Sequence, residues 1–199
     1  MTRKTAAVAT PSPLTRNEDI AVLSFIGPSG AGKSALVREL DKGGAIALNP
    51  SWTDRPRRMD ELDGSAEHTF VTGEEFSELE RSGFFLEVVQ PFGLPYRYGL
   101  PRLIRSERVP AIIVRAPMLK LVDKHFPRHR VYQVECRLNS ARKRLLDRGE
   151  KESRLGTRLE GFDAEAELGR NLADRVFYNE GTLEELVLQV TAAIREDFP

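Results

Sequence analysis

Apolar and polar residues alternate along this chain in blocks that predict strands and helices in turn. Short apolar runs rich in β-branched residues are typical of buried parallel strands. We expect such strands over 20–26, 45–48, 84–90, 111–114, 131–136 and 176–178. Segments with helical apolar spacing lie between most of them. This alternation predicts an α/β fold of three layers, with a mostly parallel central sheet between helices.

Helices are predicted where capping residues precede apolar spacing. Thr72 with Glu75, and Thr182 with Glu185, form capping boxes, in which threonine and glutamate satisfy backbone N–H groups of the first turn. Gly83 is expected to end the first of these helices. The remaining helices are expected over 35–40, about 118–124, 139–148 (capped by Asn139) and within 150–175.

The composition of the chain argues against two classes of protein, those that bind nucleic acid and those that span a membrane. The 199 residues suffice for one domain over 18–199, and 30 Lys and Arg balance 30 Asp and Glu. We therefore expect no nucleic-acid partner. No membrane partner is expected either, since no apolar run approaches the roughly 20 residues of a span. The single cysteine, Cys136, lies in an apolar stretch, which favours a buried thiol and a reducing cytoplasm. Residues 1–17 are expected to be a disordered tail, and the protein a monomer or homodimer.

The stretch 27–34 carries the strongest chemical signal. It reads Gly-Pro-Ser-Gly-Ala-Gly-Lys-Ser, the spacing of a P-loop, and stands between a predicted strand and a predicted helix. Backbone N–H groups of such a loop cradle a triphosphate. Lys33 would reach the β- and γ-phosphates, and the Ser34 hydroxyl would ligate Mg²⁺. The sequence thus predicts a P-loop NTPase fold that binds ATP and Mg²⁺. The residues expected to bind the nucleotide are Gly27, Ser29, Gly30, Ala31, Gly32, Lys33 and Ser34.

Residues 50–66 are polar and are expected to form a loop. Three arginines stand within four positions there, Arg55, Arg57 and Arg58. Guanidinium groups bind phosphate through paired hydrogen bonds, so this cluster suits a second phosphorylated molecule. The alternative is a solvated basic turn that the neighbouring acids neutralise.

Taken together, these motifs resemble guanylate kinase and its relatives. The resemblance rests on the P-loop, on Ser-x-Thr-x-Arg-x-x-Arg-x-x-Glu-x-x-Gly over 51–64 and on Phe-Val-Thr-Gly-Glu-Glu-Phe over 70–76. It continues at 83–87, Tyr98-Gly99, 145–149 and Asn179, and so covers nearly everything after the tail. It implies a P-loop kinase with a small acceptor-binding insertion over about 50–100 and a helical lid over about 148–175.

The resemblance also implies a role for each site residue. Arg55 and Arg58 would grip the phosphate of the acceptor, with help from Tyr98. Ser51 and Glu87 would read the guanine edge. The lid arginines that would close over the phosphates are Arg148, Arg154 and Arg158. The implied catalytic charges are Lys33, Arg55, Arg148 and Arg158, and Asn179 is implied in nucleotide binding.

Several positions depart from the guanylate kinase pattern. Asp54 stands where a second hydroxyl residue is expected, and His68 replaces a phosphate-binding tyrosine. Leu100 stands where a serine would help to read guanine, and the segment over 94–97 is longer than usual. These changes put the acceptor of the phosphoryl group in question.

The strand over 112–116 lacks the acids that guanylate kinases carry there. No carboxylate at that strand end can therefore support Mg²⁺. The metal would depend on Ser34, phosphate oxygens and water, which Mg²⁺ tolerates. We conjecture that Asp54 or Glu87 supplies an acid that supports the metal ion without being one of its direct ligands.

Some of these departures point to a sister family, ribose 1,5-bisphosphate phosphokinase. Gly-Ser-Ala-Glu-His over 64–68 looks like a segment of that family, which also lacks the strand acid. His68 would then either donate to an acceptor phosphate or pack as a structural histidine. Glu87, Arg55 and Arg58, however, look more like recognition of a nucleoside monophosphate. We therefore expect ATP-dependent phosphoryl transfer to GMP, with ribose 1,5-bisphosphate as the alternative acceptor and a non-catalytic binding module as a third hypothesis.

Overall fold

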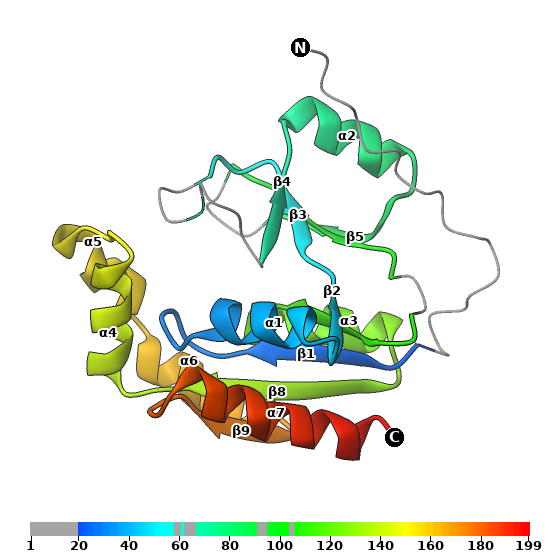
Figure 1. Cartoon of the computed structure of the whole chain (residues 1–199). Coiled ribbons are helices and arrows are strands. Elements are labelled where there is room, and N and C mark those ends of the chain that lie inside the picture. The colour runs from blue at the N-terminus through cyan, green and yellow to red at the C-terminus, as the bar shows by residue number, and fades with distance from the viewer. Residues whose placement is uncertain (1–19, 58–60, 62–66, 91–94, 104–105) are drawn as a thin grey trace, which may run out of the picture.

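The chain folds into two sheets, one above the other in Figure 1, with helices around them. The computed structural model describes residues 20–57, 61, 67–90, 95–103 and 106–199. The expected tail over 1–17 and the candidate Arg58 lie outside these residues.

The larger sheet is the central layer of the molecule. Its five strands are all parallel, in the order β2-β7-β1-β8-β9. They are β1 (Val22–Ile26), β2 (Ile46–Leu48), β7 (Val109–Ile113), β8 (His129–Glu135) and β9 (Arg175–Tyr178). Every residue of β1 is buried, as expected for a strand covered on both faces. The P-loop follows directly from the carboxyl end of this central strand.

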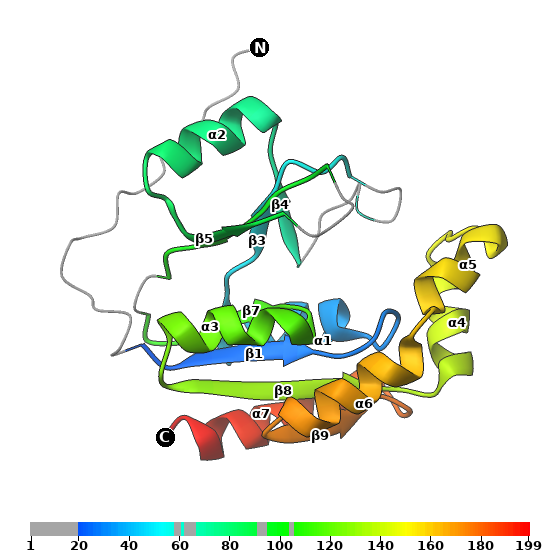
Figure 2. The same cartoon turned by 180° about the vertical axis from the view of Figure 1, so that it is seen from behind.

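Helices cover both faces of the larger sheet. Figure 1 shows α1 (Lys33–Lys42) and α7 (Leu183–Asp197) in front of it, and Figure 2 shows α3 (Leu119–His125) and α6 (Phe162–Leu172) on the opposite face. A short 3₁₀ helix over Ala116–Met118 leads into α3. The predicted three-layer arrangement is therefore confirmed. Two further helices, α4 (Leu138–Asp147) and α5 (Glu152–Leu159), stand beside the P-loop end of the sheet.

The smaller sheet has four strands in the order β4-β3-β6-β5. They are β3 (Ser51–Thr53), β4 (His68–Phe70), β5 (Phe85–Val89) and β6 (Tyr98–Pro101). β3 runs parallel to β4, whereas β6 pairs antiparallel with both β3 and β5. The expectation of a loop throughout 50–66 is wrong at β3, and β4 and β6 were not expected. These strands have only three or four residues, so the pairing partner rather than the local pattern determines them.

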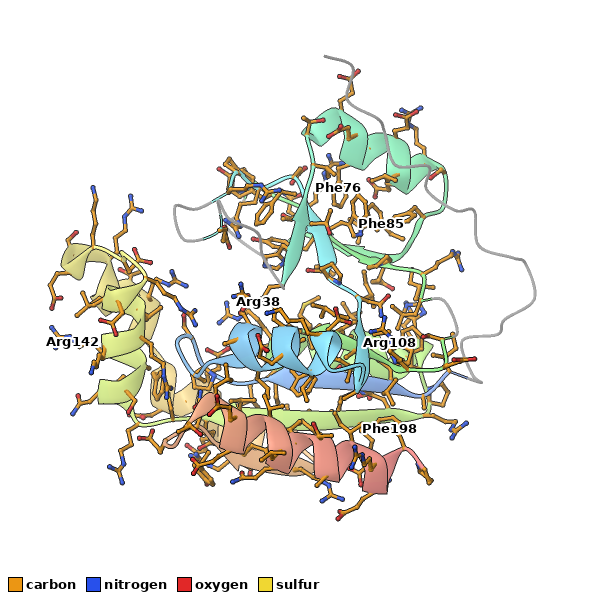
Figure 3. The ribbon with its side chains drawn as sticks, in the orientation of Figure 1. Arg38, Phe76, Phe85, Arg108, Arg142 and Phe198 are labelled. Atoms are coloured by element: carbon orange, nitrogen blue, oxygen red, sulfur yellow. The ribbon has the colours of Figure 1, made fainter. Side chains whose placement is uncertain are left out.

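One face of the smaller sheet packs under α2 (Gly73–Arg81) through aromatic rings. Phe76 of α2 stacks on Phe85 with ring centroids 4.7 Å apart, and both lie between the helix and the sheet in Figure 3. Trp52 meets Phe84 edge-on at 5.0 Å. The opposite face of the smaller sheet turns toward the larger sheet and carries polar side chains.

Both predicted capping boxes are present, at Thr72 and at Thr182. The expected cap at Asn139 is wrong, because α4 begins at Leu138 and its N-cap residue is Arg137, two positions earlier. Glu180 binds the start of this helix instead. Its carboxylate accepts the Arg137 N–H, and also the Ser140 hydroxyl at 3.0 Å. A carboxylate from a distant segment thus replaces a local side chain, which sequence spacing could not reveal.

Cys136 is buried, as expected, at the end of β8. Burial raises the pKa of its thiol, which is typical of a structural rather than a reactive cysteine. Within the described part of the chain, no helix combines the length and apolar character needed to cross a bilayer.

Candidate active site

The P-loop curls around the carboxyl end of β1 on glycines with positive φ. Gly27, Gly30 and Gly32 have φ values of +135°, +80° and +101°, a region that favours glycine. A Cβ atom on Gly27 would lie 2.1 Å from the Val134 carbonyl oxygen, and one on Gly32 would lie 2.2 Å from Asn179 Nδ2. Both backbone conformation and close packing therefore require these glycines.

Asn179 supports the loop from the end of β9. Its side-chain amide donates to the Ala31 carbonyl at 2.8 Å, and the residue is buried. Arg144 of α4, which the sequence did not single out, donates to the Asn179 carbonyl at 2.7 Å. The structure thus brings Asn179 to the P-loop, where its contacts position the loop backbone.

Lys33 points back into the loop. Its Nζ donates to the carbonyl oxygens of Gly27 at 2.7 Å and Pro28 at 3.1 Å. Burial lowers the pKa of Lys33 below its ordinary value, and the nearby Glu67 carboxylate opposes that shift. The positive charge of Lys33 is therefore held within the loop that would surround a phosphate.

Ser34 is bound by Glu67, a residue that sequence reasoning did not single out. The Ser34 hydroxyl donates to Glu67 Oε1 at 2.6 Å. Burial alone would raise the pKa of Glu67, but the Lys33 charge and the Ser34 hydroxyl hold it below its ordinary value. Glu67 directly precedes β4, so this bond joins the smaller sheet to the P-loop. The only sequence signal was its place beside His68.

The face of the smaller sheet opposite α2 collects four of the predicted substrate residues. The Ser51 hydroxyl lies 2.7 Å from His68 Nδ1, and the rings of His68 and Tyr98 are 5.5 Å apart. Tyr98 pairs with Val89 across the β5–β6 ladder, two residues from Glu87, which places Tyr98 and Glu87 on the same face. This face is turned toward the larger sheet in Figure 1.

Arg55 is bound by its own segment. Its guanidinium makes two hydrogen bonds to the Glu61 carboxylate, at 2.7 and 3.0 Å, and lies 5.1 Å from the centre of the Phe70 ring. Burial opposes the charge, but Glu61 raises the pKa of Arg55, and Tyr98 is close enough to contribute. Arg55 Nε is buried without a hydrogen-bond partner among the described residues.

The two conjectural metal-supporting acids are engaged elsewhere. Asp54 accepts the backbone N–H of Arg97 at 2.7 Å and its Nε at 2.8 Å. Glu87 bonds to His125 Nε2 at 2.9 Å and to Lys124 Nζ at 3.1 Å, and these contacts lower the pKa of Glu87. The acid found against Ser34 is Glu67 instead.

Of the three lid arginines, Arg158 reaches the P-loop. Its guanidinium lies 3.4 Å from the Ser29 hydroxyl and pairs with the Glu150 carboxylate. Arg148 and Arg154 are exposed. The structure therefore brings one predicted catalytic lid residue to the nucleotide site and leaves the other, Arg148, on the surface.

A hollow opens beside the loop where β8 and β9 end. Its lining residues are Cys136, Arg137, Tyr178 and Glu180. Cys136 Sγ lies 3.8 Å from the Gly30 carbonyl oxygen, so the hollow adjoins the P-loop. Ligands of parallel α/β sheets bind at this carboxyl edge.

Comparisons with known proteins agree with this geometry. The chain is 31% identical over 179 residues to guanylate kinase of Thermotoga maritima, a match that covers 86% of this chain and 84% of that protein. It is 32% identical over 149 residues to guanylate kinase of Rhodopirellula baltica, covering 70% and 71% respectively. A shorter match to guanylate kinase of Nitrosococcus oceani is 49% identical over 73 residues, about a third of either protein. No protein-family model matches the chain.

A solved structure shares the fold. The crystal structure of guanylate kinase from Anaplasma phagocytophilum superposes with a TM-score of 0.60, covering 90% of this chain and 87% of that one at 19% identity. That likeness confirms the predicted P-loop kinase fold, and the two long sequence matches extend through both sheets. The chain therefore belongs to the guanylate kinase family.

Proposed function

We propose that this protein transfers the γ-phosphoryl group of ATP to GMP, giving ADP and GDP. The observation that carries the proposal is the P-loop facing a polar sheet surface that holds Ser51, His68, Glu87 and Tyr98. A kinase for a phosphorylated acceptor needs these two sites opposite each other. The guanylate kinases among the relatives support GMP as the acceptor.

The reaction needs positioning and positive charge more than covalent chemistry. A phosphate oxygen of GMP attacks the γ-phosphorus of ATP, and the bond from that phosphorus to the bridging oxygen breaks, so that ADP leaves. Lys33 would neutralise charge on the β- and γ-phosphates. Arg55 and Tyr98 would hold the GMP phosphate, and Glu87 with Ser51 would bind the guanine edge. Arg158 would contribute charge from the lid.

The residues around Ser34 fit a magnesium ion. The Ser34 hydroxyl and the Glu67 carboxylate are oxygen donors 2.6 Å apart, and Mg²⁺ prefers oxygen ligands. When bound, Mg²⁺ would neutralise part of the negative charge on the β- and γ-phosphates. In the described residues, no group of three or more His, Cys, Asp or Glu is placed to hold a metal ion.

The hollow lined by Cys136, Arg137, Tyr178 and Glu180 would accept the adenine of ATP. It adjoins the P-loop through Cys136 and Gly30, and it lies at the edge of the sheet where nucleotides bind. The buried, unreactive thiol also supports a cytoplasmic location.

The test is an assay of ADP release with ATP and Mg²⁺ that compares GMP, dGMP, AMP, UMP and ribose 1,5-bisphosphate. The proposal expects GMP to give the highest kcat/KM. A preference for ribose 1,5-bisphosphate would contradict it in favour of the sugar-phosphate alternative. Absence of turnover with every acceptor would favour the non-catalytic module.

A further inference from the structure

The end of β7 carries a cation and no carboxylate. β7 ends at Ile113 and is followed by Val114 and Arg115. Arg115 extends into solvent and its Nε lies 3.5 Å from the Glu165 carboxylate of α6. This strand end therefore supplies no negative charge to a metal ion at the P-loop.

A carboxylate reaches the same P-loop serine from the other sheet. Glu67 stands immediately before His68 of β4, which pairs with Ser51 of β3, and the Glu67 carbonyl accepts the Ser51 hydroxyl at 3.1 Å. Its Oε1 accepts the Ser34 hydroxyl at 2.6 Å, and its charge is the largest favourable influence on the buried Lys33. The carboxylate thus sits beside both side chains that handle phosphate and metal in a P-loop.

We propose that Glu67 is the carboxylate that holds Mg²⁺ beside Ser34, in place of the absent acid after β7. The proposal rests on the proposed function, because it requires ATP in the P-loop. Two oxygens at adjacent positions around Mg²⁺, each about 2.1 Å from the ion, lie about 3 Å apart. The Ser34–Glu67 separation is close to that spacing, so a small outward shift of either side chain would admit the ion.

The position of Glu67 in the fold has a consequence for how the two substrate sites are coupled. Ser34 lies in the first turn of α1, directly after the P-loop, whereas Glu67 directly precedes β4 of the sheet that would hold GMP. A metal ion shared between them ties the placement of the acceptor segment to the presence of the metal–nucleotide complex. An acid after β7 would belong to the same sheet as the P-loop and would make no such link.

A competing explanation gives the same contact a different role. Glu67 could act only as a substitute anion at the phosphate-binding position near Lys33. Removing its charge would then strengthen ATP binding whether or not metal is present. If Glu67 holds the metal, removing its charge weakens binding only when metal is present. The two explanations therefore predict different effects on the same measurement.

The experiment is isothermal titration calorimetry of a non-hydrolysable ATP analogue, in MgCl₂ and in EDTA, for the wild type and three variants. The measured quantity is the ratio of Kd in EDTA to Kd in Mg²⁺. Glu67→Gln should reduce this ratio about 10- to 100-fold. Glu67→Asp, which keeps a shorter carboxylate, should retain part of it. Glu165→Gln is the matched control, since it removes another charge near Lys33 but none in contact with Ser34, and should leave the ratio unchanged.

Thermal unfolding of each variant establishes that it is folded before the ratios are compared. A Glu67→Gln ratio equal to that of the wild type overturns the proposal, as does tighter binding in EDTA with an unchanged ratio. A wild type that binds the ATP analogue in a Mg²⁺-dependent manner but does not phosphorylate GMP would refute the proposed function alone. The Glu67 comparison would still be decisive in that case.

Discussion

The nucleotide side and the acceptor side of this molecule are built on different physical principles. The P-loop is made by backbone geometry, in which glycines with positive φ turn N–H groups inward beside a fully buried strand. The acceptor face is made by side chains on and beside short strands, and several of its charged side chains already have ion-pair partners. Arg55 is bound to Glu61, and Glu87 to Lys124 and His125.

This difference determines what must change at each site when its ligand binds. The glycines already fix the backbone N–H groups of the P-loop in place, and only the Lys33 and Ser34 side chains there have protein partners to exchange. A charged side chain that already has an ion pair must share or exchange that partner when a substrate arrives. Substitutions on the nucleotide side should therefore act through charge or backbone shape, and those on the acceptor side through changes of partner.

The largest effect is expected from Lys33→Ala. Removing the positive charge inside the loop should reduce kcat about a thousandfold or more, because a fixed charge near the transferred phosphoryl group is lost. Far-UV circular dichroism should be unchanged. Lys42→Ala is the control, since it removes an exposed cation of the same helix that pairs only with Glu39 in the described contacts. Full activity of the Lys33 variant would contradict the role of the loop.

Backbone shape can be separated from charge with Gly27→Ala. The substitution combines an unfavourable φ with a Cβ atom 2.1 Å from the Val134 carbonyl oxygen, and should cost about 2–5 kcal/mol in the free energy of unfolding. Gly44→Ala also meets a positive φ, at +77° rather than +135°, but has nothing within 4 Å, so it should cost only about 1–2 kcal/mol. Chemical denaturation measures both, and equal losses would mean that close packing at Gly27 is unimportant.

The core sheet and the P-loop could be predicted because their signals are local. The apolar runs at β1 and β8 and the glycine spacing after β1 each identify a structure without knowledge of distant residues. The capping boxes at Thr72 and Thr182 are local for the same reason. Asn139 shows the limit, since the start of α4 is bound by Glu180, which is 40 positions from Ser140 and 43 from Arg137.

The acceptor side was predicted less completely because its features depend on distant pairing. β6 forms only because β3 and β5 lie on either side of it. The contact of Glu67 with Ser34 joins residues 33 positions apart, and nothing in the local sequence distinguishes Glu67 from other surface acids. The roles of Arg55, Glu87 and Tyr98 came from a family resemblance, and they stay predictions.

A smaller effect is expected on the acceptor side. Glu87→Gln should weaken the binding of GMP by about 1–3 kcal/mol, because a charged hydrogen bond is lost. The measurement is a rise in KM for GMP with KM for ATP unchanged. Lys124→Ala tests the exchange of partners. It removes one cation from Glu87 and should leave KM for GMP the same or lower. Indifference of the enzyme to Glu87→Gln would favour a sugar-phosphate acceptor.

The smallest effect is expected far from both sites, at Asp197. Its carboxylate accepts hydrogen bonds from Arg175 at 2.7 and 2.8 Å and from the Tyr132 hydroxyl at 2.6 Å, and these partners lower the pKa of Asp197. Its contribution to stability is present above the ordinary pKa of 3.8 and is lost as pH falls through the lower folded-state value.

Asp197→Asn should therefore cost about 1–2 kcal/mol in the free energy of unfolding at pH 7, and the difference from wild type should shrink below about pH 4. Urea denaturation followed by far-UV circular dichroism at both pH values measures this. KM for GMP should be unaffected. A stability difference that persists unchanged at pH 3 would mean that the carboxylate charge is not the cause.

The edge-on packing of Trp52 against Phe84 gives the molecule an intrinsic optical probe. The chain has one tryptophan, and it belongs to the smaller sheet, on the side that α2 covers. Indole emission on unfolding therefore reports the loss of that sheet alone, whereas the ellipticity of the peptide groups is dominated by the helices around the larger one. Comparing the two transition midpoints would show whether the halves of this kinase unfold as a single cooperative unit.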